Sequence, residues 1–450
     1  MNFKNTKLGD VAEEITVGHV GPMASEYVTS GIPFLRSQNV LPFNITTNDI
    51  RYITPTFHAR LKKSSLRPGD VVIVRTGKPG TCAVIPDWLE EANCSDLVIV
   101  RCGKRAHPRY VAYWVNSLAA HHISGHIVGA VQQHFNVGAA RQMPVLLPEF
   151  DGQLRILEIL GSLDDKIELN RRMNETLEAM SQAIFHDWFV DFGPTRRKME
   201  GATDPVQIMG GLVTNAAQAQ QAASLFPTTL GDDGMPTGWR TRKVADVADR
   251  VAMGPFGSRI TKDNFVSHGV PVIRGKNLAE GFIDHDFVYL TREKAAELSG
   301  SQARHEDIIF THRGTLGQVG RIYPGSRYPA YVVSQSQLLL SVDRTQTSPL
   351  FLYFFFRSDD GLRKWLANSG GAGVPAIAQP TRSLKSIEFL DPGSVLAQHF
   401  DACARVLEHR ACSARRESET LGSMRDLLLP KLMSGELRLR DAEAQLEAAQ

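Results

Sequence analysis

The stretch that decides the fold runs from Gln153 to Phe189 and reads QLRILEILGSLDDKIELNRRMNETLEAMSQAIFHDWF. Its apolar and small positions recur in alternating steps of four and three residues, which is the 3.5-residue period of a coiled-coil seam. A helix of this length reaches roughly 55 Å, so something has to lie along it. The seam positions are Ile156, Leu160, Leu163, Ile167, Asn170, Asn174, Leu177 and Ile184.

The sequence supplies its own partner for this helix. Near the C-terminus, Glu419-Thr420-Leu421 repeats Glu175-Thr176-Leu177, and other seam positions match as well. Two copies of one seam in one chain predict an antiparallel intramolecular pair of long helices. The interface residues that we expect are Ile156, Leu160, Leu163, Ile167, Leu177, Phe400, Leu407 and Leu421.

Two asparagines on the seam, Asn170 and Asn174, allow two interpretations. Buried polar seam residues fix the register and the partner at a cost in stability. Alternatively, the helix widens there into an end that is exposed to water. The sequence leaves both interpretations open.

The segments that precede the two helices repeat each other in order. Gly31 to Arg36 corresponds to Gly269 to Arg274, and the strand Val71–Val74 corresponds to a strand that begins at Asp307. We therefore expect an α+β protein with two tandem mixed α/β domains and two long helices that pair as an antiparallel coiled coil. The expected boundaries are a first domain at 1–150, a long helix at 151–193, a linker at 194–239, a second domain at 240–391, a long helix at 392–437 and a charged tail at 438–450.

Composition places the chain among ordinary globular proteins. The net charge is only +2, but positive charge is concentrated in the blocks 1–150 and 240–390, which makes them candidates for touching a polyanion. The five cysteines form no CxxC motif, which indicates reduced thiols in a cytoplasmic protein without a metal site. We expect no signal peptide and no transmembrane helix.

Three motifs that suggest chemistry have simpler explanations. The loop from Arg75 to Thr81 resembles a phosphate loop, but Pro79 follows its lysine and a strand follows the loop, so we expect a strand–turn–strand connection. Asp164-Asp165 lies beside the seam and suits a solvated helix face better than a nuclease site. His121, His122 and His126 have no fourth ligand at metal-binding spacing. The sequence predicts no catalytic apparatus.

The chain resembles the specificity subunit of type I restriction–modification systems. The likeness lies in the helical segments Leu160 to Ile167, Leu177 to Met180 and Trp188 to Phe192, in Pro236 to Trp239, and in Leu429 to Leu437. The resemblance implies a non-catalytic subunit in which each domain reads one half of a split site in double-stranded DNA. The paired helices would set the spacing and dock two modification subunits that bind S-adenosylmethionine. Restriction subunits, which use ATP and magnesium, would join outside, and this chain would bind no cofactor itself.

Basic side chains of the two domains are the expected DNA contacts, because Lys and Arg on phosphates give register and side chains at base edges give specificity. The candidates are Arg36, Arg75, Lys78, Arg101, Lys104 and Arg105 in the first domain, and Arg259, Arg274, Lys276, His312, Arg313 and Arg321 in the second. Two other classes of protein are weighed against this hypothesis. A self-contained DNA-processing enzyme needs a cofactor loop or a carboxylate cluster, and a structural scaffold needs no pair of positively charged domains.

Overall fold

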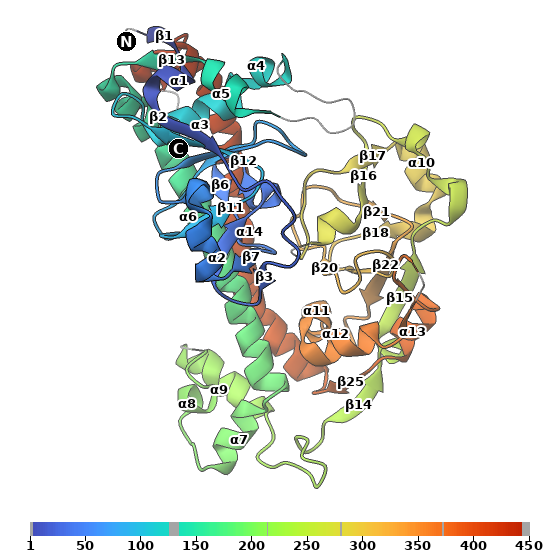
Figure 1. The fold of residues 1–450 in the computed structure, drawn as a ribbon. Helices are drawn as coiled ribbons and strands as arrows, with labels where there is room; N and C mark the ends of the chain where they lie inside the picture. The colour runs from blue at the N-terminus through green and yellow to red at the C-terminus, as the bar shows by residue number, and fades with distance from the viewer. Residues whose placement is uncertain (1–2, 126–134, 214, 280, 371–372, 443–450) are drawn as a thin grey trace. The chain divides into compact units, whose positions relative to one another are not determined.

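The computed structural model describes residues 3–125, 135–213, 215–279, 281–370 and 373–442. The chain forms two compact units (Figure 1). Unit 1 consists of Met1–Arg171 with Arg416–Gln450, and unit 2 of Arg172–Arg415. Both long helices contribute a segment to each unit. No helix within the described residues is both long and apolar enough to cross a bilayer.

The two long helices are α6 (Phe150–Phe189) and α14 (Ser394–Ser434), of 40 and 41 residues. Helix α6 begins at Phe150, ahead of the expected Gln153, and ends at Phe189 as expected. The chain turns away after it because Phe192 adopts a left-handed φ of 55° and Pro194 opens the next helix.

In unit 1 two sheets carry the first domain. The sheet β10-β9-β12-β2 has side chains that alternate between two cores: Val71, Ile73 and Val98 face the helices, and Val72 and Val74 face the second sheet. Both faces are therefore covered. The strands of this sheet are β2 (Ala12–Val17), β9 (Val71–Val74), β10 (Cys82–Val84) and β12 (Leu97–Cys102); the second sheet holds β3 (Tyr27–Val28), β4 (Ile32–Leu35), β7 (Arg51–Ile53), β8 (Ser65–Leu66) and β11 (Ala92–Cys94).

Helices and two strand pairs complete the domain in unit 1. Helix α3 (Pro108–Ser117) packs on the sheet through Tyr110, Val111 and Trp114, and it has Pro108 in its first turn. The remaining elements are β1 (Phe3–Lys7) paired with β13 (Pro144–Pro148), β5 (Val40–Leu41) paired with β6 (Asn44–Ile45), α1 (Leu8–Val11), α2 (Pro55–Arg60), α4 (Ala120–Gly125) and α5 (Val137–Gln142).

Unit 2 repeats this arrangement with the sheets β15-β22-β19-β20 and β17-β16-β21-β18. Helix α11 (Pro349–Arg357) takes the place of α3. The strands are β15 (Ala248–Met253), β16 (Val270–Ile273), β17 (Val288–Leu290), β18 (Gln302–Ala303), β19 (Ile308–Thr311), β20 (Val319–Arg321), β21 (Tyr331–Val333) and β22 (Gln337–Val342), with β14 (Arg240–Lys243) on β25 (Glu388–Asp391), β23 (Ser369–Gly370) on β24 (Ala376–Ile377), and α10 (Arg292–Glu297), α12 (Asp359–Leu366) and α13 (Pro380–Ser386).

The repeat extends to single backbone positions. Gly31 and Gly269 adopt φ values of 148° and 147°, and a Cβ at these positions would lie 2.4 Å and 2.2 Å from a carbonyl oxygen of the neighbouring strand. Only glycine fits such a close approach. Asn39 and Asn277 each accept a backbone N–H three residues upstream, at 3.0 Å and 3.1 Å. The α+β fold class and the tandem repeat are therefore confirmed.

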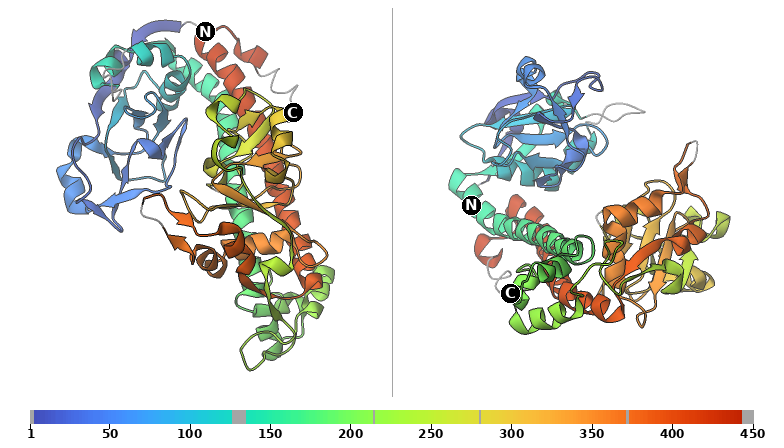
Figure 2. Two further views of the ribbon diagram at one scale, coloured as in Figure 1. Left: turned by 90° about the vertical axis from the view of Figure 1, so that its right-hand side faces the viewer. Right: turned by 90° about the horizontal axis from the view of Figure 1, so that it is seen from below.

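The two long helices pair as the seam predicts, and Figures 1 and 2 show their segments side by side within each unit. In unit 1, Leu160 shares a core with Leu428 and Leu432. In unit 2, the rings of Phe185 and Phe400 lie 5.7 Å apart. Later residues of α6 thus meet earlier residues of α14, which makes the pair antiparallel. Of the predicted interface residues, Ile156, Leu160, Leu163 and Phe400 are buried, and Ile167, Leu177, Leu407 and Leu421 are half-buried.

Asn170 settles one of the open alternatives. Its side chain is fully buried, and its Nδ2 donates to Oε2 of Glu417 on α14 at 2.8 Å. The seam at Asn170 therefore carries a buried polar contact and not an exposed helix end. A contact of this kind favours one register, because any slip leaves the amide buried without its partner.

The segment expected to be a linker is a packed helical layer instead. Helix α9 (Ala216–Leu225) joins α7 (Gly193–Met199) and α8 (Pro205–Ile208) around the end of α6. Met209 and Ala219 are buried in the same core as Trp188. The composition of this segment, rich in Ala and Gln, hid the apolar positions that make this contact.

The seam gives a prediction about stability. Leu163→Glu places a carboxylate in the core of unit 1, where Leu163 is 5% exposed, and should lower the free energy of unfolding by about 3 kcal/mol or more. Leu169→Glu on the same helix is the matched control, because Leu169 is 58% exposed. Denaturant unfolding of the full chain measures both. Equal stability of the two variants would contradict the seam.

Candidate nucleic-acid interface

Three strand ends meet at one end of the second domain. Strand β19 ends at Thr311, which pairs with Gln337 at the start of β22, and the N–H of Ser334 donates to the carbonyl of Ile273 at the end of β16. The loops that leave these strands enclose a cavity of about 410 Å³. It is lined by Pro255, Ile260, Thr261, Lys262, Phe265, Val272, Arg274, Gly275, Thr311, Arg313, Thr315, Gln318, Ser334, Gln335, Ser336 and Gln337.

Cations surround this cavity. Arg274 and Arg313, both predicted from the sequence, line it together with Lys262. Lys276 is exposed on the turn that follows Arg274, and Arg259 is exposed on the loop that supplies Ile260 and Thr261. A concave surface with one sign of charge concentrates the field and attracts a polyanion.

His312 does not add to this charge. Its imidazole is buried, and Nε2 lies 3.1 Å from the carbonyl oxygen of Gln335. Burial lowers the pKa of His312 below its ordinary value, so the ring is neutral at pH 7. His312 therefore offers DNA neither a positive charge nor an exposed ring. Its role is to hold the β21–β22 loop against the end of β19.

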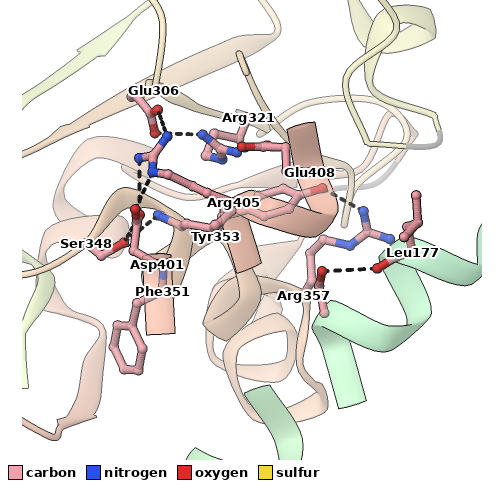
Figure 3. Close-up of polar contacts among 12 residues, drawn as sticks. Leu177, Glu306, Arg321, Ser348, Phe351, Tyr353, Arg357, Asp401, Arg405 and Glu408 are labelled. Atoms are coloured by element: carbon pink, nitrogen blue, oxygen red, sulfur yellow. Dashed lines mark hydrogen bonds and ion pairs between the residues drawn. The ribbon is translucent and has the colours of Figure 1, made fainter. Parts of the chain in front are cut away.

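The prediction of Arg321 as a DNA contact is wrong. Arg321 lies on β20, is 3% exposed, and pairs with Glu306 at 2.6 Å and with Glu408 of α14 (Figure 3). Burial lowers the pKa of this guanidinium, and the negative charge of Glu306 opposes that shift. A side chain enclosed in this way cannot reach DNA. Side chains alternate between the two faces of a strand, and Arg321 lies on the face of β20 that points inward.

The cluster around Arg321 joins the second domain to the long helices. Arg405 of α14 donates to Glu306 at 2.8 Å, and Ser348 at the start of α11 donates to Asp401 of α14 at 2.6 Å (Figure 3). Burial alone would raise the pKa of Glu306, but Arg321 and Arg405 outweigh it and hold that pKa below its ordinary value. On a second side, Arg357 of α11 pairs with Glu178 of α6.

The equivalent end of the first domain carries a similar but not identical set. Arg75 follows β9 and donates to Asp96 at 3.1 Å, and Thr76 donates to the same carboxylate. Arg36 follows β4 as Arg274 follows β16, and it pairs with Asp49 at 3.0 Å. That hydrogen bond lowers the pKa of Asp49. Lys78 is exposed at the tip of the loop. The structure thus brings Arg36, Arg75 and Lys78 to one end of the domain.

Three of the predicted residues lie elsewhere. Arg101 pairs with Asp70 at 3.4 Å and with Glu14 inside the first domain, so the structure does not place it at the loop end that carries Lys78. Lys104 and Arg105 are exposed, but they follow the opposite end of β12 from Asp96. The carbonyl of Arg105 accepts from Gln153 at the start of α6. These two cations do not belong to the loop end that carries Lys78.

Within the described residues, no three His, Cys, Asp or Glu side chains are placed to hold an ion. The ring of His122 lies 2.9 Å from the carbonyl oxygen of Ala139. His126 lies outside the described residues.

Comparison with known proteins adds to this geometry. No protein-family model matches the chain. It is 26% identical over 326 residues to the type I restriction enzyme HindI specificity subunit of Haemophilus influenzae, which covers 65% of this chain and 68% of that protein. It is 20% identical over 461 residues to the MjaIX specificity subunit of Methanocaldococcus jannaschii, covering 98% and 97% of the two chains. This chain is a relative of type I specificity subunits.

Solved structures of type I specificity subunits also match along the whole length. The specificity subunit from M. genitalium covers 96% of this chain at 10% identity with a TM-score of 0.49. The HsdS subunit from Thermoanaerobacter tengcongensis covers 97% at 14% identity with a TM-score of 0.30. These scores are low, so the sequence matches carry the relation to type I specificity subunits.

Sequence reasoning missed four polar residues at the two loop ends. Thr311, Gln318 and Gln337 line the cavity of the second domain, and Asp96 accepts hydrogen bonds from Arg75 and Thr76 at the matching end of the first. A search for positive charge could not find them. One signal was present: Thr311 ends an otherwise apolar strand, where the first copy has Val74.

The contrast between Arg321 and Arg313 gives a second prediction. Arg321→Met leaves Glu306 and Glu408 without their shared cation and should lower the free energy of unfolding by about 3–5 kcal/mol. Arg313→Met, at an exposed position eight residues away, should change it by less than about 0.5 kcal/mol. Denaturant unfolding of the two full-length variants makes the comparison. If Arg313→Met destabilised the protein and Arg321→Met did not, Arg313 and not Arg321 would be the arginine that stabilises the domain.

Proposed function

We propose that this chain is the DNA-specificity subunit of a type I restriction–modification complex, with each domain reading one half of a bipartite site in double-stranded DNA. The observation that carries the proposal is the duplicated loop end. Two copies of one fold gather cations at the same strand ends and surround them with different side chains. The relatives, which are named as specificity subunits, support the same function.

The long helices set the spacing between the half-sites and dock two modification subunits. Large apolar side chains stay exposed along them, which suits a surface that partner subunits cover. These residues are Leu154, Leu169 and Met180 on α6, and Val395, Val406 and Leu427 on α14. The modification subunits bring S-adenosylmethionine, and restriction subunits bring ATP and magnesium. This cytoplasmic subunit supplies recognition and binds no cofactor of its own.

Two experiments separate this function from the other classes. A self-contained methyltransferase would bind S-adenosylmethionine without partners, so titration of the purified chain with S-adenosylmethionine should show no binding. A structural scaffold would leave DNA modification unchanged. A comparison of methylated sites in cells with and without the gene should show one bipartite motif that depends on the gene. Binding in the first experiment, or no such motif in the second, would refute the proposal.

Salt dependence provides a third prediction. Replacing one exposed cation in each domain, Lys78→Ala with Arg313→Ala, should weaken DNA binding by the assembled complex. The slope of log K against log salt concentration should become shallower by about 0.9 for each lost phosphate contact. Lys104→Ala is the control, because it lies at the other end of β12, and its slope should equal that of the parent. A parental slope in the double variant would remove these cations from the interface.

Helix length provides a fourth prediction. Inserting one heptad after Asn174 and a matching one after Cys412 lengthens both helices by about 10 Å and keeps the seam in phase. These positions lie one helical turn beyond the contact between Asn170 and Glu417, in opposite chain directions. The unspecified spacer of the DNA site should grow by about three base pairs.

Mapping of methylated sites decides this prediction. Both half-sites should keep their sequences, because neither domain is altered. A heptad in α6 alone is the control, since it shifts Phe185 away from Phe400 and should destabilise the chain without giving a longer spacer. An unchanged spacer in the double insertion would show that the helices do not set the distance.

A further inference from the structure

Four polar side chains form a hydrogen-bonded chain in the wall of the second domain's cavity. The hydroxyl of Ser334 donates to Oε1 of Gln337, and Nε2 of Gln337 donates to Oγ1 of Thr311 at 3.3 Å. The hydroxyl of Thr311 then donates to Oε1 of Gln318 at 3.0 Å. Thr311 and Gln337 are each 1% exposed. This series of hydrogen bonds ends at Gln318, whose NH₂ group donates to no acceptor among the described residues.

The first domain shows that the fold does not need this polar chain. Thr311 pairs with Gln337 between β19 and β22, and the equivalent pair between β9 and β12 is Val74 with Leu97. The backbone is the same at both places. The N–H of Thr311 donates to the carbonyl of Gln318 at 3.0 Å, and the N–H of Val74 donates to that of Thr81 at 2.8 Å. Val74 and Leu97 are buried and apolar.

Stability does not explain why Thr311 and Gln337 are polar. Transfer of an amide and a hydroxyl into the core costs free energy unless each is hydrogen-bonded, and an apolar pair at the same sites is compatible with the fold. All four side chains line the cavity. The last of their hydrogen bonds, from Thr311, holds Oε1 of Gln318, the member from which the free NH₂ group projects. The polar chain therefore orients one side chain for a ligand.

We propose that Gln318 reads an adenine of the second half-site by contacting the adenine N6 and N7 atoms in the major groove. Thr311 and Gln337 are positioning residues for Gln318. This proposal rests on the DNA-recognition function. A carboxamide places a donor beside an acceptor, which matches the N6 donor and N7 acceptor of adenine. Oε1 of Gln318 keeps a second lone pair after accepting from Thr311. Guanine offers two acceptors, N7 and O6, on that edge, so its O6 would face the acceptor Oε1 without a proton between them.

The charge around the cavity fits this role. Arg274, Arg313 and Lys262 line the cavity beside Gln318 and can engage phosphates, which give position without sequence information. The neutral chain from Ser334 to Gln318 then supplies the contact that depends on the base. Cations and neutral polar groups thus have separate roles at one loop end.

The first test replaces the reading residue. Gln318→Ala in the full chain, assembled with its modification subunits, should lose discrimination for an A·T pair at one position of the second half-site by about 5- to 140-fold. Methylation rates on duplexes that differ at single base pairs measure this. The first half-site should be read as before. Thr81→Ala is the matched control, because Thr81 occupies the equivalent place in the first domain and donates to Lys78 instead.

The second test replaces the positioning residues by the pair that the first domain uses. The double variant Thr311→Val with Gln337→Leu removes both partners of the buried hydrogen bond, so its melting temperature should equal or exceed that of the parent. Discrimination at the same base pair should fall, because Gln318 loses its support. Unchanged discrimination, at any melting temperature, would reduce Thr311 and Gln337 to a structural role and overturn that part of the proposal.

The parent complex separates this inference from the function on which it rests. A parent that methylates no bipartite site refutes the specificity-subunit function itself. A parent that methylates a bipartite site, with Gln318→Ala keeping full discrimination at every base pair of the second half-site, overturns the role of Gln318 alone. Loss of discrimination for a pair other than A·T would likewise refute adenine as the base.

Discussion

Leu428, Leu432 and Met433 belong to helix α14, far along the chain from the first domain, yet they pack into its core beside Ile156 and Leu160. Each such side chain stabilises unit 1 by roughly 1.5–3 kcal/mol through burial. The entropy of closing so long a loop grows slowly with its length, so a contact between distant parts of the chain remains affordable. The first domain is therefore complete only when the C-terminal helix has returned to it, and the antiparallel pairing of α6 with α14 brings it there.

Charge balance inside the sheets is a second constraint, and the repeat shows how much freedom it leaves. Burial raises the pKa of Asp70 and of Asp307, which occupy the same turn in the two domains. Each has an arginine partner, but Arg101 comes from β12 whereas Arg250 comes from β15. In the first domain this cation comes from β12, the strand adjacent to β9, and in the second it comes from β15, which is separated from β19 by β22. Side chains can therefore change places while the backbone stays the same.

The sequence determines the parts of the structure that follow a period. The 3.5-residue seam predicts both long helices and their pairing, and the glycine spacing predicts the repeat. Of the predicted cations, some are exposed and others are buried, because a charged residue in the sequence does not show which way its side chain points. Arg313 and Arg321 are eight residues apart in one segment, but a loop exposes the first and strand β20 turns the second toward Glu408. One of the two carboxylate partners of Arg321, Glu408, comes from α14, and no local pattern in the sequence predicts a contact over that distance.

Aromatic side chains support the loop end of the second domain. Helix α11 carries Phe351, Phe354, Phe355 and Phe356, and the ring of Phe356 lies 4.7 Å from that of Phe310 on β19. Aromatic pairs of this kind add roughly 0.5–1.5 kcal/mol beyond the area that they bury. These aromatic rings pack against β19, the strand that ends in Thr311. Polar side chains at the strand ends reduce stability, and the aromatic face of the same sheet offsets that loss. Recognition residues can therefore change at one edge of the sheet while the other face keeps the domain folded.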